Sequence, residues 1–184
     1  MVQIAASTFE GMFVRALKVS GPIVERLKQV GFDPNRMEPA YAVSVWRQSL
    51  GVAAIEYYPT LSPADAEFQL GARMVRGYLD TIVGKVIQAA LPFLSPDALC
   101  MRLPRFFSSG IVGDVKPPEV VKVGPAHYQV TLFGEQGVPW FTAGAVDAVL
   151  RINKVSPRVK VLEVKPTSFT VDITWDPQAV QRTK

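Results

Sequence analysis

The hydrophobic period changes once along the chain, and this change separates a helical part from a strand part. Before the pair Pro117–Pro118, apolar residues recur at steps of three and four, the spacing of one helix face. After it, apolar and polar residues alternate, as in a strand with one buried face. The clearest strand carries four apolar residues on that face: Phe169, Val171, Ile173 and Trp175. The sequence therefore predicts an α+β fold, with a helical layer over about 7–110 and a strand-rich part over about 118–176.

Four strands and one helix are expected after the proline pair. The first two strands are joined by Gly124–Pro125 and the last two by a turn at Pro166, and a helix started by Thr142 lies between the hairpins. The strand order along the chain is ββαββ, which most simply gives an antiparallel four-stranded sheet covered by helices. The expected segments are the strands Val120–Val123, Tyr128–Leu132, Val159–Val164 and Phe169–Trp175, and the helix Ala143–Ile152.

One long helix is expected to begin after Ser62, because a proline follows at the first helical position. Its apolar residues repeat in steps of four and three, which predicts one continuous seam from Phe68 to Val86. Three glycines interrupt this segment, and each lowers helix propensity by roughly 1 kcal/mol relative to alanine. Close approach of another backbone at these glycines is the favoured explanation. They are Gly71, Gly77 and Gly84.

Two shorter helices have start signals of their own. Ser7 followed by Glu10 fits a capping box, in which each side chain accepts a hydrogen bond from a free backbone N–H. Ser95 opens a second short helix, and Pro104 is expected to limit it because proline has no N–H to donate. The run 105–110 is then interpreted as a transition into a loop.

The length and net charge of the chain limit the number of domains and the kinds of partner that we expect. With 184 residues and no internal linker or repeat, the chain is expected to form one domain over 1–184, ending in a basic tail over 177–184. Twenty basic residues against sixteen acidic ones give a net charge of +4. Outside the tail these charges are scattered and not clustered, so nucleic acid is not expected as a partner.

The chain has one cysteine, Cys100, and one histidine, His127. They cannot build a disulfide framework or a Cys/His zinc cluster, so we expect no metal, no cofactor and a reducing, cytoplasmic location. The most apolar stretch, Ile82–Leu94, is short and interrupted by Lys85 and Gln88. No membrane span or signal peptide is expected.

Motifs of catalysis are missing from the sequence. It contains no phosphate-binding Gly-rich loop, no HExxH, no CxxC and no GxSxG. His127 lies inside an expected strand, and Cys100 lies in an apolar helix, where a structural role explains it better than a reactive or acylated thiol. No catalytic residues are assigned, and a non-enzymatic protein is favoured.

Two aromatic clusters are the candidate binding residues. Arg105, Phe106 and Phe107 could line a ligand site or the rim of a partner interface, since charge and stacking occur together there. Trp140 and Phe141 stand beside a Gly-x-Pro turn, outside the regular apolar period, and are expected to be exposed at a homodimer or partner surface.

Several segments together resemble a paralogous family of about 200 residues, expanded in myxobacteria and described as a domain of unknown function. The resemblance covers nearly the whole chain and implies a shared fold more than an activity. Its motifs are FEGMFVRAL at Phe9–Leu17, the Pro-Ala-Tyr to Trp spacing from Pro39 to Trp46, the pair Tyr58–Pro59, and the helix containing Gly71, Gly77, Thr81 and Gly84.

A more distant resemblance is to the fold shared by haem nitric-oxide-binding domains, the vinyl-four-reductase small-molecule-binding domain and Golgi-transport tethering subunits. It is carried by the helices-first order, the two hairpins flanking a helix, and the stretch Gly137–Leu150. The axial histidine of the haem group has no counterpart here, since no histidine occurs in an expected helix. The tethering subunits carry a buried, lipid-modified cysteine, so Cys100 joins the candidate binding residues, although no motif aligns it with that position.

Two classes of function remain open from the sequence. The favoured one is a non-enzymatic regulatory or sensory module that binds a small apolar ligand, a protein partner, or both. The alternative is a small-molecule enzyme with a site lined by the loop from Arg105 to Asp114. A purely structural dimerisation domain is compatible with the first.

Overall fold

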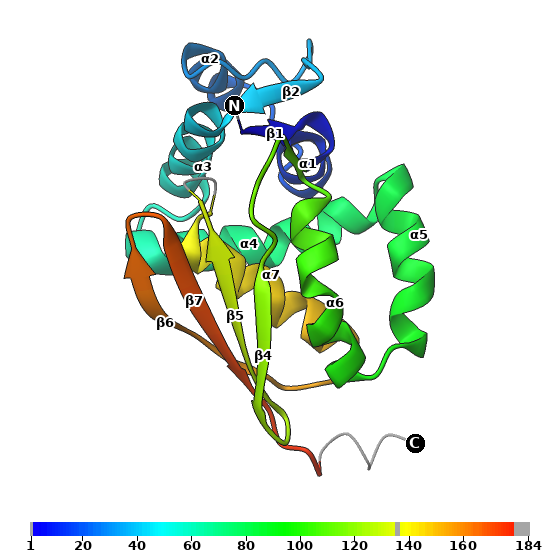
Figure 1. Cartoon of the computed structure of the whole chain (residues 1–184). Coiled ribbons are helices and arrows are strands. Elements are labelled where there is room, and N and C mark those ends of the chain that lie inside the picture. Colours follow the sequence, from blue (N-terminus) through cyan, green and yellow to red (C-terminus); the bar gives the residue numbers. More distant parts are fainter. Residues whose placement is uncertain (1, 135–136, 179–184) are drawn as a thin grey trace.

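The computed structural model describes residues 2–134 and 137–178, apart from the side chains of residues 82, 83, 87, 90 and 92. The helices form one end and one layer of the molecule, and a four-stranded sheet forms the other layer (Figure 1). The expected α+β fold is confirmed. Most of the basic tail, residues 179–184, lies outside the described residues.

The four expected strands form one antiparallel sheet. They are β4 (Glu119–Gly124), β5 (His127–Phe133), β6 (Arg158–Lys165) and β7 (Ser168–Thr174), in the spatial order β4-β5-β7-β6. Buried and half-buried residues alternate along β5 and β7, so one face meets the helices and the other carries polar side chains. The ββαββ prediction is confirmed, and α7 (Pro139–Ile152) is the helix between the hairpins.

The remaining helices precede the sheet in the chain. The two with the clearest caps are α4 (Pro63–Leu79) and α6 (Pro96–Ser108), where Ser62 accepts from the Asp65 N–H and Ser95 from the Ala98 N–H. The others are α1 (Ala6–Phe9), the π-helix η1 (Glu10–Ala16), α2 (Pro22–Gln29), α3 (Val43–Tyr57), α5 (Ile82–Ala90) and the 3-10 turn η2 (Leu91–Phe93).

The long helix expected from Ser62 to Val86 is broken after Leu79. The Thr81 hydroxyl accepts from the Gly84 N–H at 3.0 Å and donates to the Tyr78 carbonyl at 2.7 Å, which starts α5 in a new direction. The prediction of one continuous apolar seam was therefore wrong: Val86 is exposed, and the Ile82 side chain lies outside the described residues.

A second, three-stranded sheet was missed by the sequence reasoning. It joins β1 (Gln3–Ala5) to β2 (Ala40–Ala42) on one side and to β3 (Ile111–Val112) on the other. The capping box at Ser7 was also wrong, because Ser7 lies inside α1 and not at its N-cap, which is Ala5: the Glu10 N–H bonds the Ala6 and Ser7 carbonyls, and the Glu10 carboxylate pairs with Arg15.

Two helix boundaries also differ from expectation. Pro104 lies inside α6 and does not end it, so Arg105–Ser108 are helical. The helix tolerates this because proline removes one N–H while the face holding Leu99 and Leu103 remains packed in the core. The helix expected from Ala143 begins at Pro139, since proline at the first turn loses no hydrogen bond there.

The core has an aromatic N-terminal cluster and an aliphatic cluster between the sheet and helices α4, α6 and α7. Helices α4 and α7 cross at backbone contact between the two clusters. A Cβ at Gly71 would lie 1.9 Å from the Phe141 carbonyl oxygen, and one at Gly144 would lie 1.9 Å from the Phe68 carbonyl oxygen. The close approach of another backbone segment that the sequence predicts is thus found at Gly71, and at Gly77 against η1. Gly84 packs instead against the end of α4 that precedes it.

Candidate functional site

An apolar pocket of about 250 Å³ lies where the two core clusters meet. Its walls come from α4, α6, α7, β5 and the segment from β3 to β4, with Ile4, Thr8 and Trp46 contributed by the N-terminal part. Buried aliphatic side chains line the inner wall: Leu79, Leu91, Leu103, Leu132 and Val146. A small apolar molecule could bury much of its surface against this wall.

Polar groups line the pocket where it reaches the surface. The Tyr78 hydroxyl lies 3.4 Å from the Ser109 hydroxyl, and Ser109 donates to the Phe106 carbonyl. The Thr8 hydroxyl donates to the Gly110 carbonyl at 3.3 Å. Lys116 lies over the Phe133 ring at 3.7 Å and pairs with Glu119 at 2.8 Å. The rim therefore offers neutral hydrogen-bonding groups and one ammonium that already has a carboxylate partner.

The structure brings three of the six candidate residues to this pocket. Phe106 and Phe107 line it from α6, and Phe141 lines it from the first turn of α7. Phe141 is 8% exposed and packs edge-on against Trp46 at 5.5 Å, so the expectation that it is exposed was wrong. The physical reason is the earlier start of α7, which turns this residue inward.

The other three candidates lie elsewhere. Arg105 is exposed on α6 outside the pocket lining. Cys100 is 0% exposed in the core, and burial raises the pKa of its thiol to about 12. Trp140 is 37% exposed and lines a separate hollow with Phe68 and residues of β6.

Sequence reasoning missed the contributions of the N-terminal part to the pocket. Thr8 and Trp46 reach the pocket because β1 pairs with β3, and no local sequence pattern indicates that pairing. Leu132 and Val146 lie on expected inward faces, so the alternation in β5 and the spacing in α7 could have placed them.

Ionisable groups gather away from the pocket, at the other end of α6. The Lys122 ammonium lies 2.8 Å from the Asp97 carboxylate, and the Tyr128 hydroxyl also donates to that carboxylate. These two hydrogen bonds, from Lys122 first, hold the pKa of Asp97 below its usual range. Burial and the bond to Asp97 raise the pKa of Tyr128.

The described lining of the pocket holds few groups for proton transfer. Among the residues of 2–134 and 137–178 that line it, Tyr78 and Lys116 are ionisable, and no carboxylate, imidazole or thiol joins them. The half-buried Glu67, whose pKa burial raises, is outside the lining. The loop from Arg105 to Asp114 does line the pocket in part, as the enzymatic alternative required, but without an acid–base pair.

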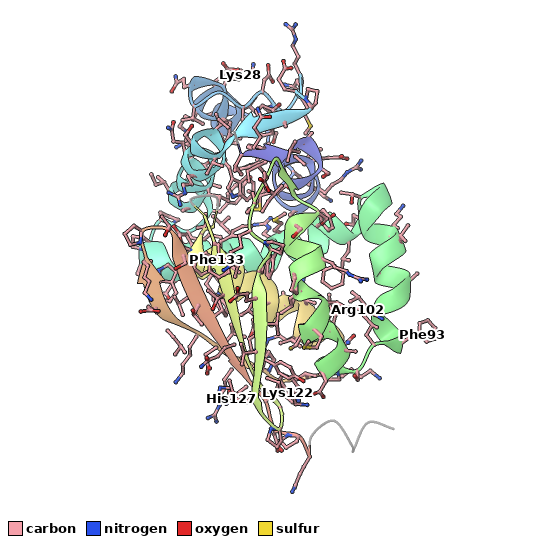
Figure 2. The ribbon with its side chains drawn as sticks, in the orientation of Figure 1. Lys28, Phe93, Arg102, Lys122, His127 and Phe133 are labelled. Atoms are coloured by element: carbon pink, nitrogen blue, oxygen red, sulfur yellow. The ribbon has the colours of Figure 1, made fainter. Side chains whose placement is uncertain are left out.

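Residues 2–134 and 137–178 contain neither a candidate metal-binding group nor a membrane-spanning helix. No group of three or more His, Cys, Asp or Glu side chains there could hold a metal ion. His127 is on the polar face of the sheet, bonded at 2.7 Å to Asp172 (Figure 2). No helix in this part of the chain is long and apolar enough to cross a membrane.

The fold is that of the H-NOX domains. A Cs H-NOX mutant containing an unnatural amino acid superposes with a TM-score of 0.67 and 13% identity, over 93% of this chain and 96% of that one. A mutant of T. tengcongensis H-NOX gives 0.67 and 13%, over 93% and 97%. An oxygen-binding H-NOX domain related to soluble guanylate cyclases gives 0.66 and 14%, over 93% and 95%.

The chain belongs to the family described as protein of unknown function (DUF2378), whose model matches residues 2–176. No curated protein matches the sequence. The resemblance to a family of unknown function and the distant likeness to the haem-binding fold are therefore both confirmed.

Haem is named for two further structural neighbours, and the described lining of the pocket here offers it no imidazole or thiolate. Axial ligation uses an imidazole, a thiolate, a thioether or a phenolate. His127 is on the far face of the sheet, and the Cys100 thiol is outside the pocket. Met74 and Tyr78 remain in the lining, but the Tyr78 hydroxyl lies beside Ser109 at the surface end of the pocket.

Proposed function

We propose that the chain is a non-enzymatic sensory or regulatory module that binds a small, mostly apolar ligand in the pocket between α4, α6, α7 and β5. The observation that carries the proposal is the pocket itself: an aliphatic inner wall and a polar rim whose one ammonium, that of Lys116, is already paired with Glu119, at the contact between the two core clusters. A molecule bound there would contact both clusters, so its binding would affect the packing of both parts of the fold. A cytoplasmic location belongs to the same proposal and is supported by the free, buried thiol of Cys100.

The volume of the pocket limits the size of the ligand. A cavity of about 150 Å³ holds benzene, and sites for drug-sized ligands span about 300–1,000 Å³. At about 250 Å³, the pocket suits a molecule of one or two fused rings, or a short alkyl chain with one hydrogen-bonding group. Because Lys116 is already paired with Glu119, a neutral polar group fits the rim better than a carboxylate.

The experiment is a titration of the purified chain with benzene, indole and naphthalene, followed by calorimetry, together with native mass spectrometry of the protein as purified. We expect saturable binding of the two-ring probes, or a retained small molecule that competes with them.

A matched pair of variants locates the binding. Ala145 lines the pocket from α7, and Ala148, three residues further along the helix, does not. Ala145→Leu should fill the pocket and weaken probe binding by about tenfold or more, whereas Ala148→Leu should leave it unchanged. Equal effects of both variants, or no binding of any probe to the wild-type chain, would refute a ligand site here.

The haem alternative has its own test. Haemin titrated into the chain should give no stoichiometric Soret band, since the lining lacks an imidazole or a thiolate. A saturable band that disappears in Tyr78→Phe would show phenolate ligation and overturn this part of the proposal.

A further inference from the structure

Strand β6 is an open edge of the four-stranded sheet. The opposite edge, β4, runs beside α6 and is tied to it by the Lys122–Asp97 pair, whereas no described element lies beyond β6 (Figure 1). An edge strand presents unpaired N–H and C=O groups to any strand that can align with it. Leu162 and Val164 on this strand are 54% and 59% exposed.

The sequence of β6 is complementary to itself in the antiparallel direction. Aligning Val161 with Leu162 of a second copy about a two-fold axis places Lys160 opposite Glu163 of that copy, twice by symmetry. The same register places Val159 opposite Val164. Only the outermost pair, Arg158 with Lys165, brings like charges together.

A β-bulge makes this register possible. Between Val161 and Glu163, the residue Leu162 has no partner in β7, so the side-chain alternation shifts by one. Before the bulge, Lys160 lies opposite Asp172 of β7 on the polar face of the sheet. After it, Glu163 lies opposite Thr170 on that same face. In this register, each residue before the bulge lies opposite a residue after the bulge of the second copy. The two facing side chains therefore lie on the same face of the joined sheet.

An aromatic side chain lies beside this edge. Trp140 lines a hollow with Phe68, Val159 and Val161, next to the backbone of β6. An indole that is 37% exposed at the side of an open strand gives an arriving strand apolar surface to cover.

We propose that a second copy of the chain docks on β6, so that two four-stranded sheets join into one antiparallel sheet of eight strands, with reciprocal Lys160–Glu163 pairs and with Trp140, Leu162 and Val164 covered. The interface is independent of the ligand pocket, and Ala145→Leu should dimerise like the wild-type chain.

Charge reversal tests both the dimer and its register, with sedimentation velocity measuring the dimer dissociation constant. Lys160→Glu and Glu163→Lys should each weaken dimerisation by about tenfold or more, because each creates two like-charge pairs. The double variant, with both charges exchanged, should restore it. Arg158→Glu should strengthen it, because it places a carboxylate opposite Lys165 of the second copy and leaves the Lys165–Glu163 pair of each chain, at 3.1 Å, in place.

Lys28→Glu is the control, since it makes the same change of charge at the far end of the molecule (Figure 2) and should leave the dissociation constant unchanged. Circular dichroism melting of each variant separates a lost interface from a lost fold. A wild-type chain that stays monomeric at about 1 mM would overturn the proposal. A double variant no tighter than its parents would overturn the register.

Discussion

A methyl group added at Gly71 tests whether α4 and α7 touch backbone to backbone. In Gly71→Ala the new Cβ would lie 1.9 Å from the Phe141 carbonyl oxygen and 2.7 Å from its carbon. An ordinary contact at this position needs at least 3.4 Å. The helices must therefore separate by roughly 1.5 Å, against the packing of both core clusters around the crossing.

The net effect is the difference of two opposing contributions. Alanine gains about 1 kcal/mol of helix propensity over glycine, while overpacking of a rigid contact costs about 1–3 kcal/mol and at times more. Backbone atoms form the wall here, so there is no flexible side chain that could move aside, and the cost falls at the upper end. We expect Gly71→Ala to lower the free energy of unfolding by about 1–2 kcal/mol, or the melting temperature by roughly 2–8 °C.

Gly51 provides the matched control. It is also inside a helix, α3, but a Cβ there would meet nothing within 4 Å. Gly51→Ala should therefore raise the melting temperature by roughly 2–4 °C, because only the propensity gain remains. Urea and thermal unfolding followed by circular dichroism measure both variants. If Gly71→Ala is as stabilising as Gly51→Ala, the close crossing does not exist in solution.

Three further predictions concern the core and its ionisable groups. Ile173→Asp places an unpaired carboxylate where the side chain is 0% exposed, so its unfolding free energy should fall by about 3 kcal/mol or more; an unchanged melting midpoint would contradict the inward face of β7. The Cys100 thiol, with a pKa of about 12 and no exposure, should react with an aromatic disulfide reagent at about pH 8 only in denaturant, and stoichiometric reaction of the native chain would show the helix is open. The lowered pKa of Asp97 stabilises the fold above the unfolded value of about 3.9 and is lost as pH falls through the folded value. Asp97→Asn should therefore flatten the loss of stability as the pH falls below the unfolded pKa of about 3.9 in urea titrations, and an unchanged slope would mean that the bond from Lys122 contributes nothing.

The sheet was predictable because its information is local. Alternation over seven residues defines which face of β5 or β7 is buried, and the turns at Gly124–Pro125 and Pro166 fix which strands are neighbours. The helix caps at Ser62 and Ser95 were equally local and were confirmed.

The pocket could not be predicted in the same way, because its walls meet through contacts that are distant in sequence. Ile4 lies opposite Ile111 in the small sheet, and strands of two or three residues are too short to show a period. The break after Leu79 depends on one hydroxyl, that of Thr81, which closes a turn that the apolar repeat conceals. Phe106 and Phe107 were singled out for their chemistry, and their place in the pocket follows only from the continuation of α6 through Pro104.

The small sheet also constrains the order in which the chain can fold during synthesis. Its central strand, β1, is made before both of its partners, and its partner β3 is made more than a hundred residues later. Until then the backbone groups of β1 on that side have no strand to pair with, and the Ala5 N–H lacks the Gly110 carbonyl. Native pairing of the N-terminal part therefore has to wait until β3 has emerged, so β1 is the last strand of its sheet to be completed although it is translated before β2 and β3.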